Sequence, residues 1–169
     1  MTSFVCSTCG DTHEGMPTDF GWQLPDDVWA IPEVERSARA KFDSDRCQLG
    51  ERFFIRCILA LPFTEQPGYY AWGVWVELRE SDFWRYIELY DKDGREEPAI
   101  PGAIANAVPG YVSTVGLPVQ VQLQDEKSRP SVRVADVGHP LSVEQLAGIS
   151  NQRYHDILAS TGVSRARSN

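Results

Sequence analysis

The strongest signal in the sequence is an alternation of apolar and polar residues in two neighbouring segments, residues 52–62 and 69–78. A period of two places successive side chains on opposite faces of a β-strand. Pro67 and Gly68 fall between the segments and are typical of a turn, so we expect an antiparallel hairpin of two long strands. The apolar face of the first strand consists of Phe53, Ile55, Cys57, Leu59 and Leu61.

Two further segments, residues 119–124 and 131–135, alternate in the same way and predict a second hairpin. Residues 81–90 change to a helical period. A capping-box pattern over residues 142–145 predicts a short helix, and residues 150–158 predict a final one. The apolar stripe of the first helix consists of Phe83, Trp84, Ile87 and Tyr90.

The segments between these elements lack a clear period. Residues 32–41 are expected to form at most a short exposed helix or a turn, and residues 43–50 a loop. Residues 101–111 are rich in Gly, Pro and Ala, which favours a connection with at most one helical turn. Two hairpins with helices between and after them predict an α+β domain with one mostly antiparallel sheet and packing helices; the strand order stays open.

The length of 169 residues fits one domain with a sizeable core. Within it we expect a metal-stapled irregular segment over residues 1–50, an α+β body over 51–160 and a frayed tail over 161–169. The net charge of −8 argues against a sequence-independent nucleic-acid binder, because phosphate contacts require a basic surface. No apolar run reaches the length of a membrane span and no signal-peptide pattern opens the chain, so we expect a cytoplasmic protein without membrane or nucleic-acid partners.

The N-terminus carries the clearest candidate chemistry. Cys6 and Cys9 are separated by two residues, and Gly10 and His13 follow. A Cys-x-x-Cys turn directs two thiolates toward one point, which suits Zn²⁺, and a glycine after the second cysteine adopts the tight backbone cheaply. A redox pair would precede a helix, and no helical period begins here. We therefore expect a structural zinc ion, an N-terminal zinc knuckle, with His13 as a third ligand.

The fourth ligand must come from elsewhere in the chain. Cys57 belongs to the apolar face of a strand and is expected to be a core residue. Cys47 lies in a polar segment where a ligand is easier to present, so it completes the predicted set of Cys6, Cys9, His13 and Cys47. Asp45 is the reserve ligand, and its alternative role is that of a turn residue.

Several short motifs, in this order, resemble a bacterial family known as domain of unknown function 2199. The resemblance covers about residues 4–160 and implies a small bacterial protein without an established activity, substrate or cofactor. The motifs are Cys6-x-x-Cys9-Gly10-x-x-His13, Asp45-Arg-Cys47 before Phe53-Phe-Ile-Arg56, Trp72-Gly-Val-Trp75, Glu80-Ser81, Arg129-Pro130, His139-Pro140-Leu141 and Glu144-Gln145-x-x-Gly148-Ile149-Ser150.

A second site is less clearly indicated. Trp75 lies on the face of its strand opposite Trp72, beside Gly73, where it can floor a ligand groove or a protein contact, and Arg56 of the neighbouring strand can supply a charge over its ring. The alternative is that this face is covered and the tryptophan is core. His139 precedes a proline ahead of a helix and either serves a function or fixes a loop by a hydrogen bond.

The sequence favours a non-enzymatic, zinc-stabilised binding or regulatory domain, because a site with four protein ligands leaves no open position for a substrate. The usual catalytic motifs are missing from the sequence. One alternative is a zinc-dependent hydrolase with a three-ligand site of Cys6, Cys9 and His13 and with Glu14 or Asp45 as base. Another is an immunity-like protein that inhibits a protein partner.

Overall fold

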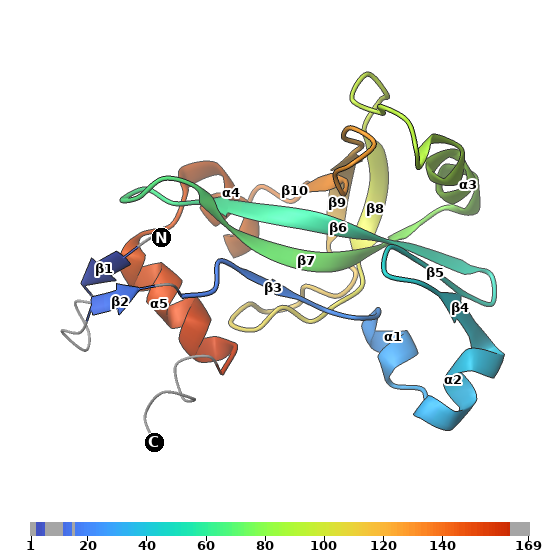
Figure 1. The fold of residues 1–169 in the computed structure, drawn as a ribbon, viewed down its shortest axis with the longest axis horizontal. Coiled ribbons are helices and arrows are strands. Elements are labelled where there is room, and N and C mark those ends of the chain that lie inside the picture. The colour runs from blue at the N-terminus through green and yellow to red at the C-terminus, as the bar shows by residue number, and fades with distance from the viewer. Residues whose placement is uncertain (1–2, 6–11, 15, 163–169) are drawn as a thin grey trace.

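A computed structural model describes residues 3–5, 12–14 and 16–162 of the protein (Figure 1). The strands are β1 (Ser3–Val5), β2 (Thr12–Glu14), β3 (Asp19–Gly21), β4 (Ala40–Phe42), β5 (Arg46–Leu49), β6 (Arg52–Pro62), β7 (Tyr69–Leu78), β8 (Ile100–Ile104), β9 (Pro118–Gln122) and β10 (Ser131–Val134). The helices are α1 (Asp26–Trp29), α2 (Glu33–Arg39), α3 (Glu80–Leu89), α4 (Pro140–Ala147) and α5 (Asn151–Ser160).

The two long strands β6 and β7 form the predicted antiparallel hairpin, paired from Phe53 opposite Leu78 to Pro62 opposite Tyr69. From β7 the sheet continues through β8, β9 and β10 and returns to β6, so these five strands close into a barrel. The second predicted hairpin is β9–β10. The expectation of an α+β fold with a mostly antiparallel sheet is thus confirmed, and the closed barrel is the feature that the sequence left open.

The strand β8 corrects the expectation of an irregular connection over residues 101–111. It pairs with both β7 and β9 and thereby closes the barrel. Gly102 explains the miss, because a Cβ atom at this position would lie 2.5 Å from Cγ1 of Val76 and 3.0 Å from the carbonyl oxygen of Glu77. The glycine that weakens the strand pattern is therefore what lets β8 approach β7 closely.

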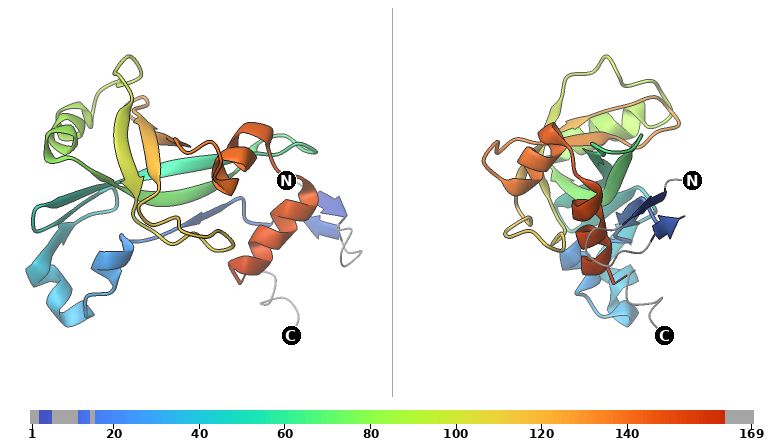
Figure 2. Two further views of the ribbon diagram at one scale, coloured as in Figure 1. Left: turned by 180° about the vertical axis from the view of Figure 1, so that it is seen from behind. Right: turned by 90° about the vertical axis from the view of Figure 1, so that its left-hand side faces the viewer.

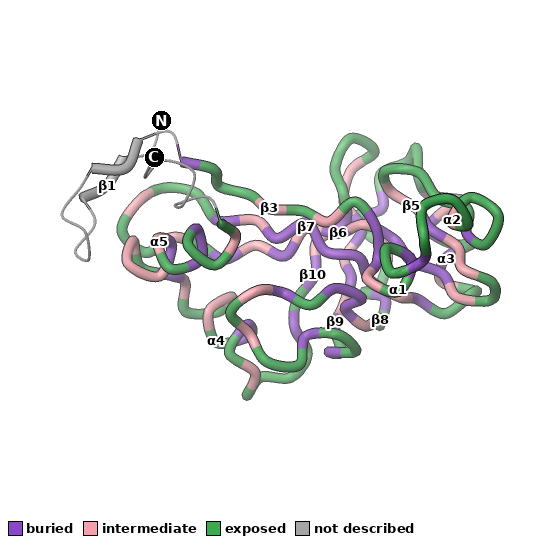
Figure 3. The backbone as a smooth tube through the Cα atoms, turned by 90° about the horizontal axis from the view of Figure 1, so that it is seen from below, coloured by how far each residue is buried: buried purple, intermediate pink, exposed green. Residues whose placement is uncertain are grey.

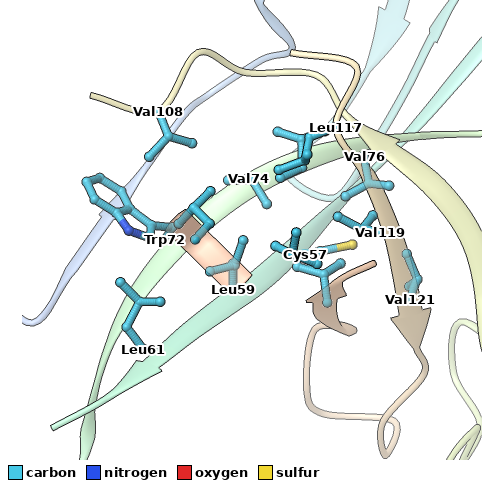
Figure 4. Packing of buried hydrophobic residues seen from close by; sticks show 14 of the residues in the cluster. Cys57, Leu59, Leu61, Trp72, Val74, Val76, Val108, Leu117, Val119 and Val121 are labelled. Atoms are coloured by element: carbon cyan, nitrogen blue, oxygen red, sulfur yellow. The ribbon is translucent and has the colours of Figure 1, made fainter. Parts of the chain in front are cut away.

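The barrel interior is filled by the apolar faces of its strands (Figure 4). Cys57 and Leu59 of β6 and Trp72 and Val74 of β7 are completely buried, as their alternation predicts. Figure 3 shows the buried backbone concentrated along these central strands, with exposed residues in the loops and at the ends. Cys57 is thus a core residue, as expected.

The part of residues 1–50 that the structure describes is more regular than expected. β3 pairs with β7, and β4 and β5 form a hairpin that continues the sheet beside β6. β5 replaces the loop expected over residues 43–50, because its four residues pair with Phe53, Phe54 and their neighbours in β6. The predicted short helix over residues 32–41 is confirmed as α2.

A small apolar cluster, here called the outer cluster, packs on the outside of the barrel. Its buried members are Leu24, Val28, Ala40, Cys47, Phe54, Trp75 and Ala105. The side chain of Asn106 ties it together: its Oδ1 accepts from the backbone N–H of Trp75 at 2.7 Å, and its Nδ2 donates to the carbonyl of Leu24 and to Asp26. Both the oxygen and the nitrogen of the Asn106 amide form hydrogen bonds, and in a buried place a polar group without a hydrogen bond would lower the stability of the fold.

Three helices pack around the barrel, seen from behind and from the side in Figure 2. α3 buries Phe83 and Tyr86, whereas Trp84 and Tyr90 of the predicted stripe are exposed. α4 begins earlier than its capping-box pattern indicates, because His139 and not Ser142 caps it. α5 follows the final helix predicted over residues 150–158, and the side chain of Ser150 caps it. No helix in the described ranges is long and apolar enough to cross a membrane.

Candidate functional site

The predicted zinc site falls mostly outside the described part of the chain. β1 and β2 pair as a short antiparallel ribbon with Phe4 opposite His13, and Cys6 and Cys9 lie in the connecting residues, which are not described. Cys47 lies in β5, and Figures 1 and 2 place the β4–β5 hairpin at the end of the molecule opposite the ribbon. The structure does not bring Cys47 to the ribbon.

The surroundings of Cys47 differ from those expected for a presented ligand. Strand alternation turns its side chain inward, into the outer cluster, where only 1% of its surface is exposed. Burial among apolar side chains, assisted by the negative charge of Asp43, raises the pKa of the Cys47 thiol to about 12. An enclosed thiol among apolar side chains packs as a small apolar group. Across the residues that can be described, no three His, Cys, Asp or Glu side chains gather as a metal-binding group.

Trp75 is covered rather than open. Its ring is completely buried in the outer cluster, and its Nε1 donates to the carbonyl of Trp22 at 2.9 Å. The alternative of a core tryptophan therefore describes this position, and the ring does not floor an open groove. Arg56 lies opposite Trp75 in the β6–β7 register, on the outer face as expected.

His139 uses both ring nitrogens within the fold. Its Nδ1 accepts from the backbone N–H of Leu141 at 3.1 Å and caps α4. Because Nδ1 accepts, the neutral ring carries its proton on Nε2, which lies 3.0 Å from the carbonyl of Val112 and donates to it. The histidine thus joins α4 to the loop before β9, which is the loop-fixing role considered for it.

A cleft of about 430 Å³ opens between the end of α3 and the β9–β10 loop. Its apolar wall is formed by Ile58, Leu89, Leu123 and Pro130, and the tyrosines Tyr86 and Tyr90 line it beside them. Charged side chains of both signs stand around these residues: Asp45, Lys92, Asp125, Glu126, Lys127 and Arg129.

Asp45 is the fixed polar group of this cleft. Arg129 Nε donates to its Oδ1 at 2.8 Å, and the Tyr90 hydroxyl and Ser44 Oγ donate to its Oδ2 at 2.8 and 3.2 Å. Burial alone would raise the pKa of the Asp45 carboxyl, but the hydrogen bonds from Arg129 and Tyr90 outweigh it and hold this pKa below its usual range. Asp45 is therefore a carboxylate at neutral pH, and it orients Arg129.

Tyr90 is held from two sides. Arg46, paired with Asp43, lies with its guanidinium carbon 4.6 Å from the centre of the Tyr90 ring. The hydrogen bond to Asp45 raises the pKa of the Tyr90 hydroxyl, since ionisation would place two negative charges together. The hydroxyl therefore stays a donor, and one wall of the cleft is preorganised without a ligand.

Sequence reasoning missed most of this site. From the sequence, Asp45 is only a reserve metal ligand, and Arg129 is only part of a motif of the family resemblance. Their pairing joins residues 84 positions apart, and no local period reveals it. The sequence offers one signal for the site: three motif segments, around Asp45, Arg56 and Arg129, carry charges next to strand residues. The structure places these segments side by side at β6. There the backbone N–H of Arg56 donates to the carbonyl of Asp45, and the backbone N–H of Ile58 donates to the carbonyl of Pro130.

The comparisons with known proteins give a family but no activity. The profile of a family described as "Uncharacterized protein conserved in bacteria", domain of unknown function 2199, matches residues 5–149. This match spans most of the chain, so the protein belongs to that family. No curated protein and no solved structure matches the chain significantly.

Proposed function

We propose that this member of the family is a non-enzymatic binding domain of the bacterial cytoplasm, which holds a small molecule in the cleft between α3 and the β9–β10 loop. The observation that carries the proposal is the preorganised pair of Asp45 and Arg129 beside an apolar wall. Small-molecule sites combine such a wall with a few fixed polar groups. Only the Nε of Arg129 is used within the described structure, so its terminal nitrogens are available to a ligand.

The state of the reactive side chains supports binding rather than catalysis. Burial raises the pKa of the Cys57 thiol as it does that of Cys47, and both nitrogens of His139 are engaged with backbone groups. The described lining of the cleft contains carboxylates, cations and tyrosines, without a histidine or a cysteine. The hydroxyl beside the fixed carboxylate is that of Tyr90, and its raised pKa keeps it protonated, so the pair of Tyr90 and Asp45 offers hydrogen bonds rather than an activated nucleophile.

Ligand-observed NMR with a library of metabolite-sized compounds tests this proposal. We expect at least one compound that binds saturably and is recovered chemically unchanged. The matched variant is Ser128→Trp, which fills the cleft from the exposed β9–β10 loop and should abolish binding. The control is Ser37→Trp, on the exposed surface of α2 and not in the cleft lining, which should leave binding unchanged. Absence of any saturable binder, or conversion of a bound compound by the wild-type protein but not by Ser128→Trp, would contradict the proposal.

We further propose that Cys6, Cys9 and His13 bind a zinc ion that stabilises the β1–β2 ribbon. Support comes from the antiparallel pairing of β1 and β2, which brackets the two cysteines and carries His13 in the second strand. Metal analysis of the purified protein should give one zinc per chain, lost in Cys6→Ser/Cys9→Ser. Cys47→Ala is the control and should retain the metal. Zinc loss in that control, or a metal-free wild type, would contradict this set.

A zinc-dependent hydrolase is the second candidate, and the position of Cys47 favours it. Without Cys47 the ribbon supplies three ligands, and a three-ligand zinc keeps a position for water. Of the two bases considered, Asp45 is engaged by Arg129 and Tyr90 in the cleft, which leaves Glu14. Zinc-dependent cleavage of an activated ester that disappears in Glu14→Gln while the zinc content stays constant would establish this candidate over the first.

A further inference from the structure

Arg56 is a partly buried cation without a hydrogen-bond or ion-pair partner among the residues that the structure describes. It projects from the outer face of β6, and its Nε is enclosed without any hydrogen-bond acceptor. Its two terminal nitrogens are not enclosed, and they make no hydrogen bond or ion pair with a residue that the structure describes. By comparison, Arg52 in the same strand pairs with both Glu77 and Asp27. Leaving a buried donor unmet is unfavourable, so this arrangement is unusual for a purely structural arginine.

Two glycines hold the Arg56 side chain flat against the sheet. Gly21 of β3 and Gly73 of β7 are directly paired, and the guanidinium lies over both. A Cβ atom at Gly21 would lie 2.4 Å from Nη2 of Arg56, and one at Gly73 would lie 3.6 Å from the same atom. Neither glycine has the positive backbone angle that would demand glycine for another reason. The missing side chains therefore make a shelf, Gly21 and Gly73, that fits the guanidinium.

The electrostatic surroundings favour an anion over this shelf. Burial lowers the pKa of Arg56, and repulsion from the positive charge of Arg129 lowers it further. The negative charges of Asp45 and Asp19 oppose this shift without reversing it. The nearby carboxylates are Asp45, which is engaged by Arg129, and Asp19, which is exposed on β3 and lies beyond ion-pair distance of Arg56. Because the pKa of Arg56 stays lowered despite both carboxylates, its charge is incompletely compensated, and an added anion would stabilise it.

We propose that Arg56, seated on Gly21 and Gly73, binds an oxyanion, a carboxylate or a phosphate group, through its two terminal nitrogens. The planar guanidinium donates two parallel hydrogen bonds to such a group, which a lysine cannot reproduce. The site goes beyond the cleft, because Arg56 does not line it. The test of this anion site is therefore independent of the test of the proposed cleft ligand. An extended ligand could occupy both sites, because Ile58 lines the cleft and is the next residue after Arg56 on the same face of β6.

The test follows the Nε–H resonance of Arg56 in ¹⁵N-labelled full-length protein. Its enclosure slows exchange with water and makes the signal observable, and its loss in Arg56→Lys assigns it. Titrations use inorganic phosphate, acetate and, at matched ionic strength, sodium chloride. We expect a saturable shift with phosphate or acetate at millimolar concentration and none with chloride; phosphate alone would identify a phosphate site, and both anions a general oxyanion site.

Gly21→Ala is the decisive variant, because it displaces the guanidinium tip without removing its charge. Only a flexible side-chain end meets the added methyl group, so the fold should be preserved. We expect anion affinity to fall about tenfold in Gly21→Ala, followed by the Arg56 Nε–H signal, and in Arg56→Lys, followed by the backbone N–H signal of Gly73. Arg133→Lys, on the exposed face of β10, is the control and should leave affinity unchanged. An unsaturable shift, or equal affinity in Gly21→Ala and wild type, would overturn the proposal.

Discussion

The interior and the outer face of the same β6–β7 hairpin are built by different rules. Inside the barrel, every second residue is apolar, and the packing is continuous around five strands. Outside, the same strands carry in succession the outer cluster around Trp75, the glycine shelf under Arg56, and the cleft beside Ile58. We therefore expect the interior to contribute most of the free energy of unfolding, whereas the outer face consists of small separate regions whose polar groups can bind a ligand.

Neighbouring residues of β6 give the largest expected contrast. Leu59 is completely buried in the barrel, whereas Ile58 lies half-buried at the cleft. Leu59→Ala should lower the free energy of unfolding by about 2–5 kcal/mol, because it leaves a cavity in a close-packed core. Ile58→Ala should lower it by roughly 1 kcal/mol, as expected for a partly exposed site. Urea denaturation measures both, and equal losses would contradict the separation of the two faces.

Asn106 provides the next contrast, within the outer cluster. Asn106→Ala leaves the backbone N–H of Trp75 and the carbonyl of Leu24 without their partner in a buried place. We expect a loss of about 1–3 kcal/mol, the usual penalty for unmet buried groups. The control is Asn151→Ala at the half-buried start of α5, where the side-chain oxygen accepts a hydrogen bond from Gln66, and a comparable loss there would show that the buried amide of Asn106 has no special role.

The interior could be read from the sequence because its information is local. β6 and β7 match the alternating segments to the residue, and the hairpin follows from the prolines and glycine between them. The sequence does not predict β8, because Gly102 has no side chain to contribute to an alternating pattern. In the structure this glycine leaves room for the side chain of Val76 in the neighbouring strand. Barrel closure depends on β8, so it could not be predicted either.

The outer face could not be read in the same way because its contacts join distant segments. Cys47 looked accessible in a polar sequence, but pairing of β5 with β6 turns it inward beside Trp75. Arg56 was placed correctly on the outer face, yet its seat depends on Gly21, which belongs to another strand. The zinc ligands Cys6, Cys9 and His13 stay a prediction from spacing.

His139 sharpens the comparison at the edge of the barrel. His139→Ala removes both the cap of α4 and the contact with the Val112 carbonyl, and we expect a loss of about 1 kcal/mol. His139→Asn is the matched variant, because asparagine is a strong N-cap residue but is too short to reach Val112 as well. Recovery of most of the stability in His139→Asn, measured by thermal unfolding, would assign the effect to the cap; no recovery would assign it to the loop.

The smallest effect is expected at Asp45, where the cleft meets water. Its pKa is lowered in the folded state, so its contribution is present above the ordinary aspartate value of about 3.9 and is lost as pH falls through the lower folded value. Since Arg129 is exposed, we expect no more than about 1 kcal/mol. Asp45→Asn should therefore be slightly less stable than wild type at pH 7 and approach the stability of wild type as the pH falls below the ordinary aspartate range. Asp91→Asn, in an exposed loop, is the control and should differ little from wild type at pH 7. A stability difference between Asp45→Asn and wild type that does not change with pH would mean that the shape of the side chain, rather than its charge, holds Arg129 at the cleft. The proposal of a fixed carboxylate in the cleft would then be wrong.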